Sequence, residues 1–239
     1  MIKSVGIIGF GQMGKILADI FSARFNVLVF DTNPPKNLKI NNLKEVASAD
    51  LVIFCVALED LKISLKKASP FIKNESIVLD ITSLKEKPLK LMQKLLPSKV
   101  SILGTHPMFG PNSLSRTSVK NIVFCPARIS AEKLQEIERI FNQLGFNVFK
   151  MRAKKHDQMM ARSQLVAHLF AQLTKDLKIR EFSFAPESFR LMLKAFEMAD
   201  PSEEFLHSMI RNNKFSLKTI TEIQTRIEKY LMQFNDLNH

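Results

Sequence analysis

The sequence is short of cysteine and has no long hydrophobic segment. Only two cysteines, Cys55 and Cys125, occur among its 239 residues, which excludes a disulfide framework. Both lie in apolar, strand-like runs, so we expect buried free thiols in a reducing cytoplasm. The longest uninterrupted apolar run covers residues 51–58 and is far shorter than the roughly 20 residues that span a bilayer. No signal peptide is apparent, and we expect a cytoplasmic protein with no membrane partner.

Acidic side chains are also scarce, with 23 Asp and Glu against 35 Lys and Arg, and the formal net charge is +12. A basic chain can bind nucleic acid, but these residues form no aromatic-interleaved cluster and no recognisable nucleic-acid-binding motif. We expect most of them on solvated faces, and no nucleic-acid partner. Some could instead draw an anionic small-molecule substrate into a cleft. Composition leaves these interpretations open.

The first part of the chain, residues 1–152, alternates short apolar runs with helical patterns. This alternation predicts an α/β domain with a Rossmann-type, doubly wound, mostly parallel sheet. Gly145 follows the last predicted helix, where a helix C-cap favours glycine. The predicted strands cover residues 4–10, 27–30, 51–56, 76–80, 100–103, 121–124 and 147–150, and the predicted helices cover 13–24, 61–71, 84–95 and 131–144.

The second part, residues 153–239, loses this alternation and predicts a smaller all-helical domain. Pro186 and Pro201 punctuate its helical patterns. Its apolar content is high for a segment that covers one face of a neighbouring domain, so we expect a homodimer held by the helical domain. Met, Leu and Phe recur at helical spacing over residues 156–178, 187–197, 203–212 and 217–234.

A glycine-rich turn follows the first predicted strand. Three of the chain's seven glycines form a G-x-G-x-x-G pattern that opens the first helix. Such a turn brings backbone N–H groups and the positive end of a helix dipole close to a pyrophosphate. The pattern therefore predicts a dinucleotide cofactor. The expected cofactor-binding residues of this turn are Gly9, Gly11, Gln12, Met13 and Gly14.

Asp31 follows the second predicted strand and indicates which dinucleotide binds. A carboxylate at this position accepts hydrogen bonds from the ribose hydroxyls and repels a 2′-phosphate. Thr32 and Asn33 come next, in place of an arginine that would bind that phosphate. We therefore expect NAD rather than NADP, with Asp31 as a further cofactor-binding residue.

Two polar side chains each follow a predicted strand, Ser83 after one and His106 after another. Ligands of open α/β sheets bind at the carboxyl ends of strands, so both are expected to face the nicotinamide. A histidine there could accept a proton from a substrate hydroxyl while hydride leaves the same carbon. Ser83 could orient the substrate or the nicotinamide, or cap the helix that follows. Taken alone, both residues also fit purely structural roles.

With these residues the sequence resembles the prephenate/arogenate dehydrogenase family over nearly the whole chain. The resemblance is carried by GIIGFGQMG, DITSLK, GTHPMFGP and HDQMMARSQLVAHLFA, and more loosely by FRLMLKAFEMADPSEEFLHSMIRNN. Related β-hydroxyacid dehydrogenases share only the glycine-rich opening. The HPMFGP segment looks most like that of arogenate-type members.

The resemblance implies an NAD-dependent oxidative decarboxylation of prephenate, arogenate or both in tyrosine biosynthesis. His106 matches the family's catalytic histidine, which takes the proton of the ring hydroxyl as hydride passes to the cofactor. Loss of the ring carboxylate as CO2 then restores aromaticity. Ser83 matches the serine that hydrogen-bonds near the same hydroxyl. We expect no metal site.

The helical half holds the expected contacts to the substrate. Gln164 and His168 are four residues apart on one helix face and match polar positions of the family near the substrate, although a helix-packing role fits them equally well. The preceding pair, His156-Asp157, is expected to start and cap this helix rather than to take part in chemistry.

One position departs from the pattern of prephenate-preferring members. They place an arginine five residues before the Asp of an Asp-Pro pair, where it binds the side-chain carboxylate of the substrate. The pair here is Asp200-Pro201, and the position holds Ala195. Arg190 and Lys194 are candidate replacements, but an ammonium is no equivalent of an arginine fork. The choice between prephenate and arogenate therefore stays open at this point.

Two other functions fit parts of the sequence. The same architecture occurs in oxidoreductases that act on other small acids or imines. The net charge also allows a non-catalytic protein that binds dinucleotides or nucleic acid.

Overall fold

The structure is a computed structural model that describes residues 2–34, 40–111, 119–199 and 202–236. Its contacts divide the chain into two compact units, residues 1–156 and 157–239. The boundary predicted from the sequence, between residues 152 and 153, precedes helix α7 (Ala153–Arg162), whereas the division by contacts falls within this helix.

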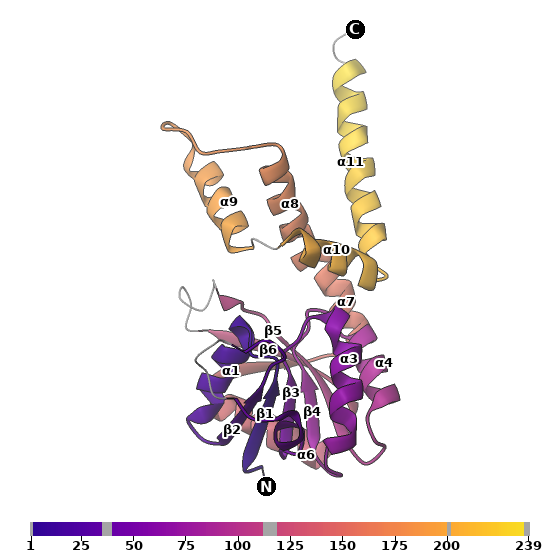
Figure 1. Cartoon of the computed structure of the whole chain (residues 1–239). Helices are drawn as coiled ribbons and strands as arrows, with labels where there is room; N and C mark the ends of the chain where they lie inside the picture. Colours follow the sequence, from indigo (N-terminus) through magenta and orange to yellow (C-terminus); the bar gives the residue numbers. More distant parts are fainter. Residues whose placement is uncertain (1, 35–39, 112–118, 200–201, 237–239) are drawn as a thin grey trace. The chain divides into compact units, whose positions relative to one another are not determined.

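The first unit is built on a seven-stranded sheet in the order β2-β1-β3-β4-β5-β6-β7 (Figure 1). All neighbouring strands are parallel except β5 and β6, which are antiparallel. The predicted Rossmann-type, mostly parallel fold is therefore confirmed. The strands are β1 (Ser4–Ile8), β2 (Asn26–Phe30), β3 (Leu51–Phe54), β4 (Ile77–Asp80), β5 (Ser101–Pro107), β6 (Lys120–Arg128) and β7 (Phe146–Lys150).

Helices cover both faces of this sheet. Phe21 of α1 and Phe141 of α6 pack edge to face, with ring centroids 5.4 Å apart, in the core that both helices form with the strands. Helices α3 and α4 pack against each other on the opposite face (Figure 1). The helices of this unit are α1 (Gln12–Ser22), α2 (Leu43–Ala47), α3 (Leu58–Ala68), the 3-10 turn η1 (Ser69–Phe71), α4 (Glu86–Leu95) and α6 (Ala131–Gln143).

Two details of this unit bear on the sequence predictions. Gly145 has φ +83° and its N–H donates to Asn142 O at 3.0 Å, which is the predicted helix C-cap. The prediction that His106 follows its strand is wrong, because β5 continues to Pro107. The antiparallel partner β6 pairs with this extension, in the register His106↔Val123 and Pro107↔Ile122. A His-Pro segment is typical of a loop, but pairing with β6 keeps this one extended.

The second unit is entirely helical within its described residues. It contains α8 (Gln164–Asp176), α9 (Glu187–Met198), α10 (Glu203–Asn212) and α11 (Ser216–Asp236). Its buried core is small and consists of Leu165, Leu206 and Met209. Many large apolar side chains of α9 and α11 are instead exposed, including Leu191, Tyr230, Leu231 and Phe234. None of the described helices is both long and apolar enough to cross a membrane.

Candidate functional site

The glycine-rich turn connects β1 to α1 with a conformation that requires glycine at two positions. Gly9 has φ +100°, and a Cβ there would lie 2.4 Å from Cys55 O. A Cβ at Gly14 would lie 2.1 Å from Gly9 O, so the helix can approach the turn only without a side chain. A Cβ at Gly11 would meet nothing within 4 Å. Space above Gly11 is therefore open to a ligand, and Gly11 is the N-cap of α1 without any side-chain cap.

The carboxylate of Asp31 is fixed beside this turn. Its Oδ2 accepts the N–H of Phe10 at 2.6 Å, and its Oδ1 accepts the N–H of Asn33 at 2.8 Å. Gly9 N also donates to Phe30 O at 2.8 Å, which ties the turn to the end of β2. The remaining lone pairs of Asp31 are available to hydroxyl groups of a ligand. Gln12 is exposed and Met13 half-buried in the first turn of α1.

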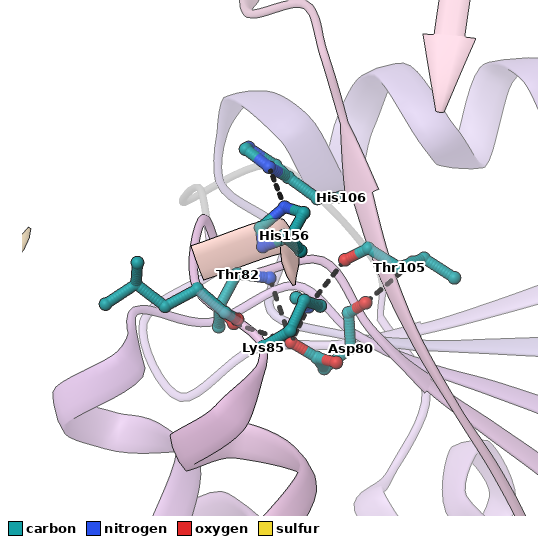
Figure 2. Close-up of polar contacts among 7 residues, drawn as sticks. Asp80, Thr82, Lys85, Thr105, His106 and His156 are labelled. Carbon is teal, nitrogen blue, oxygen red and sulfur yellow. Dashed lines mark hydrogen bonds and ion pairs between the residues drawn. The ribbon is translucent and has the colours of Figure 1, made fainter. Parts of the chain in front are cut away.

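A buried ion pair lies at the carboxyl ends of β4 and β5 (Figure 2). The ammonium of Lys85, which is fully buried, donates to Asp80 Oδ2 at 2.5 Å and to Thr105 O at 2.6 Å. Asp80 Oδ2 also accepts from the N–H of Thr82 at 3.1 Å, while Asp80 Oδ1 is buried without a hydrogen-bond partner among the described residues. Thr105 Oγ1 donates to Asp80 O at 2.6 Å. This cluster locks the two strand ends together.

The imidazole of His106 lies beside that of His156 (Figure 2). His106 Nδ1 and His156 Nε2 are 3.0 Å apart, and the rings meet edge to face at 73°. Both side chains are buried, with 4% and 0% exposure. Burial lowers the pKa of His106 well below its ordinary value, and repulsion from His156 and Lys85 lowers it further. His106 is therefore neutral near pH 7, as a general base has to be.

His156 corrects one expectation from the sequence. It does not start or cap a helix, since α7 begins three residues earlier at Ala153, and His156 N donates to Arg152 O at 3.0 Å. Its side chain packs instead against a residue fifty positions earlier in the chain. No local pattern indicates such a contact.

Ser83 lies three residues beyond the end of β4, next to the strand that holds His106. Residues Asp80 and Gly104 of these parallel strands are register partners. Ser83 is half-buried, and its hydroxyl has no hydrogen bond to a described residue. It is not the N-cap of α4, a position held by Lys85. Its hydroxyl is thus available to a ligand.

In the second unit, Gln164 and His168 each present an unpartnered buried atom. His168 Nδ1 lies 2.5 Å from Ala199 O, and its ring packs edge to face on Phe205. Gln164 Oε1 and His168 Nε2 are buried without hydrogen-bond partners among the described residues. Burial lowers the pKa of His168, opposed by the hydrogen bond to Ala199 O, which raises it. Nδ1 must carry the proton donated to that carbonyl, so Nε2 of the neutral ring is an acceptor.

The two cations of α9 differ in their surroundings. Arg190 Nη2 donates to Ser183 O at 2.9 Å, and its Nε lies 3.0 Å from Glu181 Oε1 without hydrogen-bond alignment. Lys194 is exposed, as is Ala195. The pair Asp200-Pro201 lies outside the described residues. Within the described part of the chain, no group of three or more His, Cys, Asp or Glu side chains could hold a metal ion.

The sequence predictions missed the ion pair of Asp80 and Lys85 and the contact of His156 with His106. Asp80 and Lys85 open and close the DITSLK segment, so the segment itself was the available signal. Their pairing and complete burial follow only from the adjacent ends of β4 and β5.

Comparisons with known proteins support one family. A family model described as "Prephenate dehydrogenase, nucleotide-binding domain" matches residues 36–150. Arogenate dehydrogenase 1 of Arabidopsis thaliana is 24% identical over 94% of this chain and 38% of its own length. A probable arogenate/prephenate dehydrogenase of Methanocaldococcus jannaschii is 25% identical over 90% of this chain and 52% of its own length. The chain therefore covers only about half or less of these two relatives.

Solved structures show the same fold. Prephenate dehydrogenase from Aquifex aeolicus in complex with hydroxyphenyl propionate and NAD+ superposes with a TM-score of 0.77 at 19% identity, over 99% of this chain and 92% of that chain. Arogenate dehydrogenase from Synechocystis superposes with a TM-score of 0.71 at 16% identity, over 98% of this chain and 93% of that chain. The likeness extends over both units.

Proposed function

We propose that the chain is a member of the prephenate dehydrogenase family and catalyses the NAD-dependent oxidative decarboxylation of prephenate or arogenate in tyrosine biosynthesis, a proposal that the family model and the similar dehydrogenases support. The observation that carries this proposal is the environment of His106. This side chain is a buried, neutral imidazole on the strand end where an α/β sheet binds its ligand. The findings favour this activity over other oxidoreductase activities and over a non-catalytic role.

We propose NAD as the cofactor on the geometry of the glycine-rich turn. The open space at Gly11 and the uncapped N-terminus of α1 suit a pyrophosphate, and Gln12 and Met13 lie in the same helical turn. Asp31, held beside the same turn by its hydrogen bonds to Phe10 N and Asn33 N, would accept hydrogen bonds from the ribose hydroxyls. When bound, NAD supplies the hydride acceptor of the reaction.

The chain's own residues have two roles in the proposed reaction. His106 transfers a proton, and Ser83 positions the substrate hydroxyl. His106 accepts the proton of the substrate's ring hydroxyl through Nε2, while hydride leaves the ring carbon that bears this hydroxyl. The bond from the ring to its carboxylate then breaks, CO2 departs, and the released electron pair restores the aromatic ring. The phenolic oxygen takes the proton back from His106. Ser83 holds the hydroxyl through its side chain, which has no hydrogen bond to a described residue.

We propose that Gln164 and His168 bind the side chain of the substrate. Both present a buried acceptor without a partner among the described residues, and an unpartnered buried acceptor is costly. The ammonium of arogenate is a donor that would satisfy both. The side-chain carboxylate that both substrates carry would meet Arg190 or Lys194, and position 195 lacks the arginine of prephenate-preferring members. Arogenate is therefore expected to be accepted at least as well as prephenate.

Steady-state measurements of NADH formation with both substrates test this proposal. We expect kcat/KM for arogenate to equal or exceed that for prephenate, and Ala195→Arg to shift the ratio toward prephenate. A preference of wild-type protein for prephenate by more than about tenfold, or about 1.4 kcal/mol, would contradict the assignment of the substrate. No turnover of either substrate would contradict the function itself.

Asp31 is expected to determine the choice of cofactor. Replacing Asp31→Ser together with Thr32→Arg removes the charge that repels a 2′-phosphate and adds a cation to bind it. The double variant should prefer NADP, as judged from kcat/KM for the two cofactors. Thr32→Arg alone is the control and should retain NAD preference, since the carboxylate stays. An unchanged preference in the double variant would place the discriminating contact elsewhere.

We also propose a homodimer formed through the second unit, and a cytoplasmic location in keeping with two free thiols. Leu231 and Phe234 of α11 are 59% and 65% exposed. A groove of about 900 Å³ between α8 and α11 includes Phe170 and Ile227 in its lining. Sedimentation at micromolar concentration should show a dimer that Leu231→Glu dissociates. Ile63→Glu, at an exposed site of α3, should leave the dimer intact. A monomeric wild-type protein would exclude this assembly.

A further inference from the structure

The two ring nitrogens of His106 have different surroundings. Nδ1 faces His156 Nε2 at 3.0 Å (Figure 2), whereas Nε2 has no hydrogen bond to any described residue. A neutral imidazole carries one N–H, and a contact of this length between two ring nitrogens holds one proton. The proton therefore belongs either to His106 Nδ1 or to His156 Nε2.

These two arrangements have opposite consequences for catalysis. If His156 Nε2 carries the proton, neutral His106 carries its own on Nε2 and has no lone pair to offer a substrate. If His106 Nδ1 carries it, the lone pair of His106 lies on Nε2, and the ring is a base. The second arrangement alone permits the proton transfer that the proposed function requires.

We propose that His156 is a positioning residue that accepts the Nδ1–H of His106 and so keeps the basic lone pair on Nε2. This inference rests on the proposed function. It gives His156 the part that the buried carboxylate has in a serine protease triad, where a hydrogen bond selects the tautomer of the catalytic histidine. Here the acceptor is an imidazole.

The surroundings of His106 favour the uncharged form of its ring. Among the described residues, the titratable groups whose charges act on His106 are His156 on α7 and Lys85 in the segment before α4. The charge of Lys85 is paired with Asp80 at the end of β4. Burial and these neighbours hold the pKa of His106 low, so the ring of His106 stays uncharged until substrate arrives. The backbone of His106 is fixed within β5 by its pairing with β6, and the ring of His156 is fully buried.

The reaction also leaves this hydrogen bond intact. The ring hydroxyl gives its proton to His106 Nε2, and the phenolic oxygen takes it back after CO2 leaves. Nδ1–H stays bonded to His156 throughout, and the base is regenerated in its starting tautomer. No relay of protons through His156 is needed.

Two substitutions of His156 separate an acceptor from a packing role. His156→Gln places a carbonyl oxygen near the position of Nε2, while His156→Leu fills similar space without an acceptor. We expect kcat to fall by about 10²-fold in the Leu variant and by less than about tenfold in the Gln variant, with KM for NAD little changed.

A spectrum of the wild-type protein tests the tautomer without any turnover. A two-bond ¹H–¹⁵N correlation distinguishes the protonated nitrogen in each of the five histidine rings, and His106→Asn assigns the signals of His106. We expect the proton on Nδ1. A proton on Nε2, or equal activities of the Gln and Leu variants, would overturn the role of His156. A wild-type protein with the expected tautomer and no activity on either substrate would contradict the proposed function alone.

Discussion

Replacing His106 with asparagine is expected to lower kcat by about 10²–10⁴-fold, the usual range for the loss of a general base. Asparagine is polar and similar in size, so the β5–β6 pairing around position 106 should persist. It cannot accept a proton near neutral pH. Affinity for NAD should change little, because the glycine-rich turn and Asp31 are untouched. Stopped-flow or steady-state measurements of NADH formation give the decrease in kcat. Calorimetry measures the affinity for NAD that the variant retains.

The pH profile makes this expectation specific. In wild-type protein, kcat/KM should rise with pH through the pKa of His106, which burial and repulsion from His156 and Lys85 hold well below the ordinary histidine value. Activity should therefore be retained below pH 6.5, where a solvent-exposed histidine would already be protonated. This acidic limb should vanish in His106→Asn.

A matched control uses a histidine outside the site. His207 lies on α10 with its side chain 58% exposed, and His207→Asn should leave both turnover and pH profile unchanged. Near-full activity of His106→Asn, or an acidic limb that persists in it, would show that another group is the base.

The sheet, the glycine-rich turn and most helices could be predicted because their signals are local. An apolar run in a parallel strand, a G-x-G-x-x-G turn and a glycine after a helix each express a constraint set by near neighbours in the chain. Gly9 and Gly14 illustrate this. A side chain at either position would collide with backbone atoms of the same turn or of the segment that follows the adjacent strand.

The centre of the site could be predicted only in part, because its contacts are long-range. Ser83 and His106 were found from their places near strand ends and from a family resemblance. The extension of β5 to Pro107 depends on pairing with β6, and the contact of His106 with His156 joins residues fifty positions apart. A lysine is normally exposed, so nothing in the local sequence of Lys85 indicates complete burial.

Lys85→Met is expected to destabilise the first unit by about 3–5 kcal/mol, the usual cost of breaking a buried ion pair by removing one partner. The ammonium of Lys85 neutralises Asp80 and donates to Thr105 O, and both groups are buried. Methionine fills similar volume, so loss of packing contributes little. Asp80 already has one buried oxygen without a partner among the described residues. Without Lys85, its full charge stays buried, and among the described residues Thr82 alone donates hydrogen bonds to it.

Urea unfolding followed by circular dichroism measures the effect, and a second substitution identifies its cause. Asp80→Asn in the Lys85→Met background removes the uncompensated charge and keeps an acceptor for Thr82, so stability should recover by about 2 kcal/mol or more. Lys150→Met is the control, since the Lys150–Glu138 pair is partly exposed and should contribute no more than about 1 kcal/mol. If the double variant is no more stable than Lys85→Met, the cost lies in packing or in the lost hydrogen bond to Thr105, and the buried charge of Asp80 is not its source.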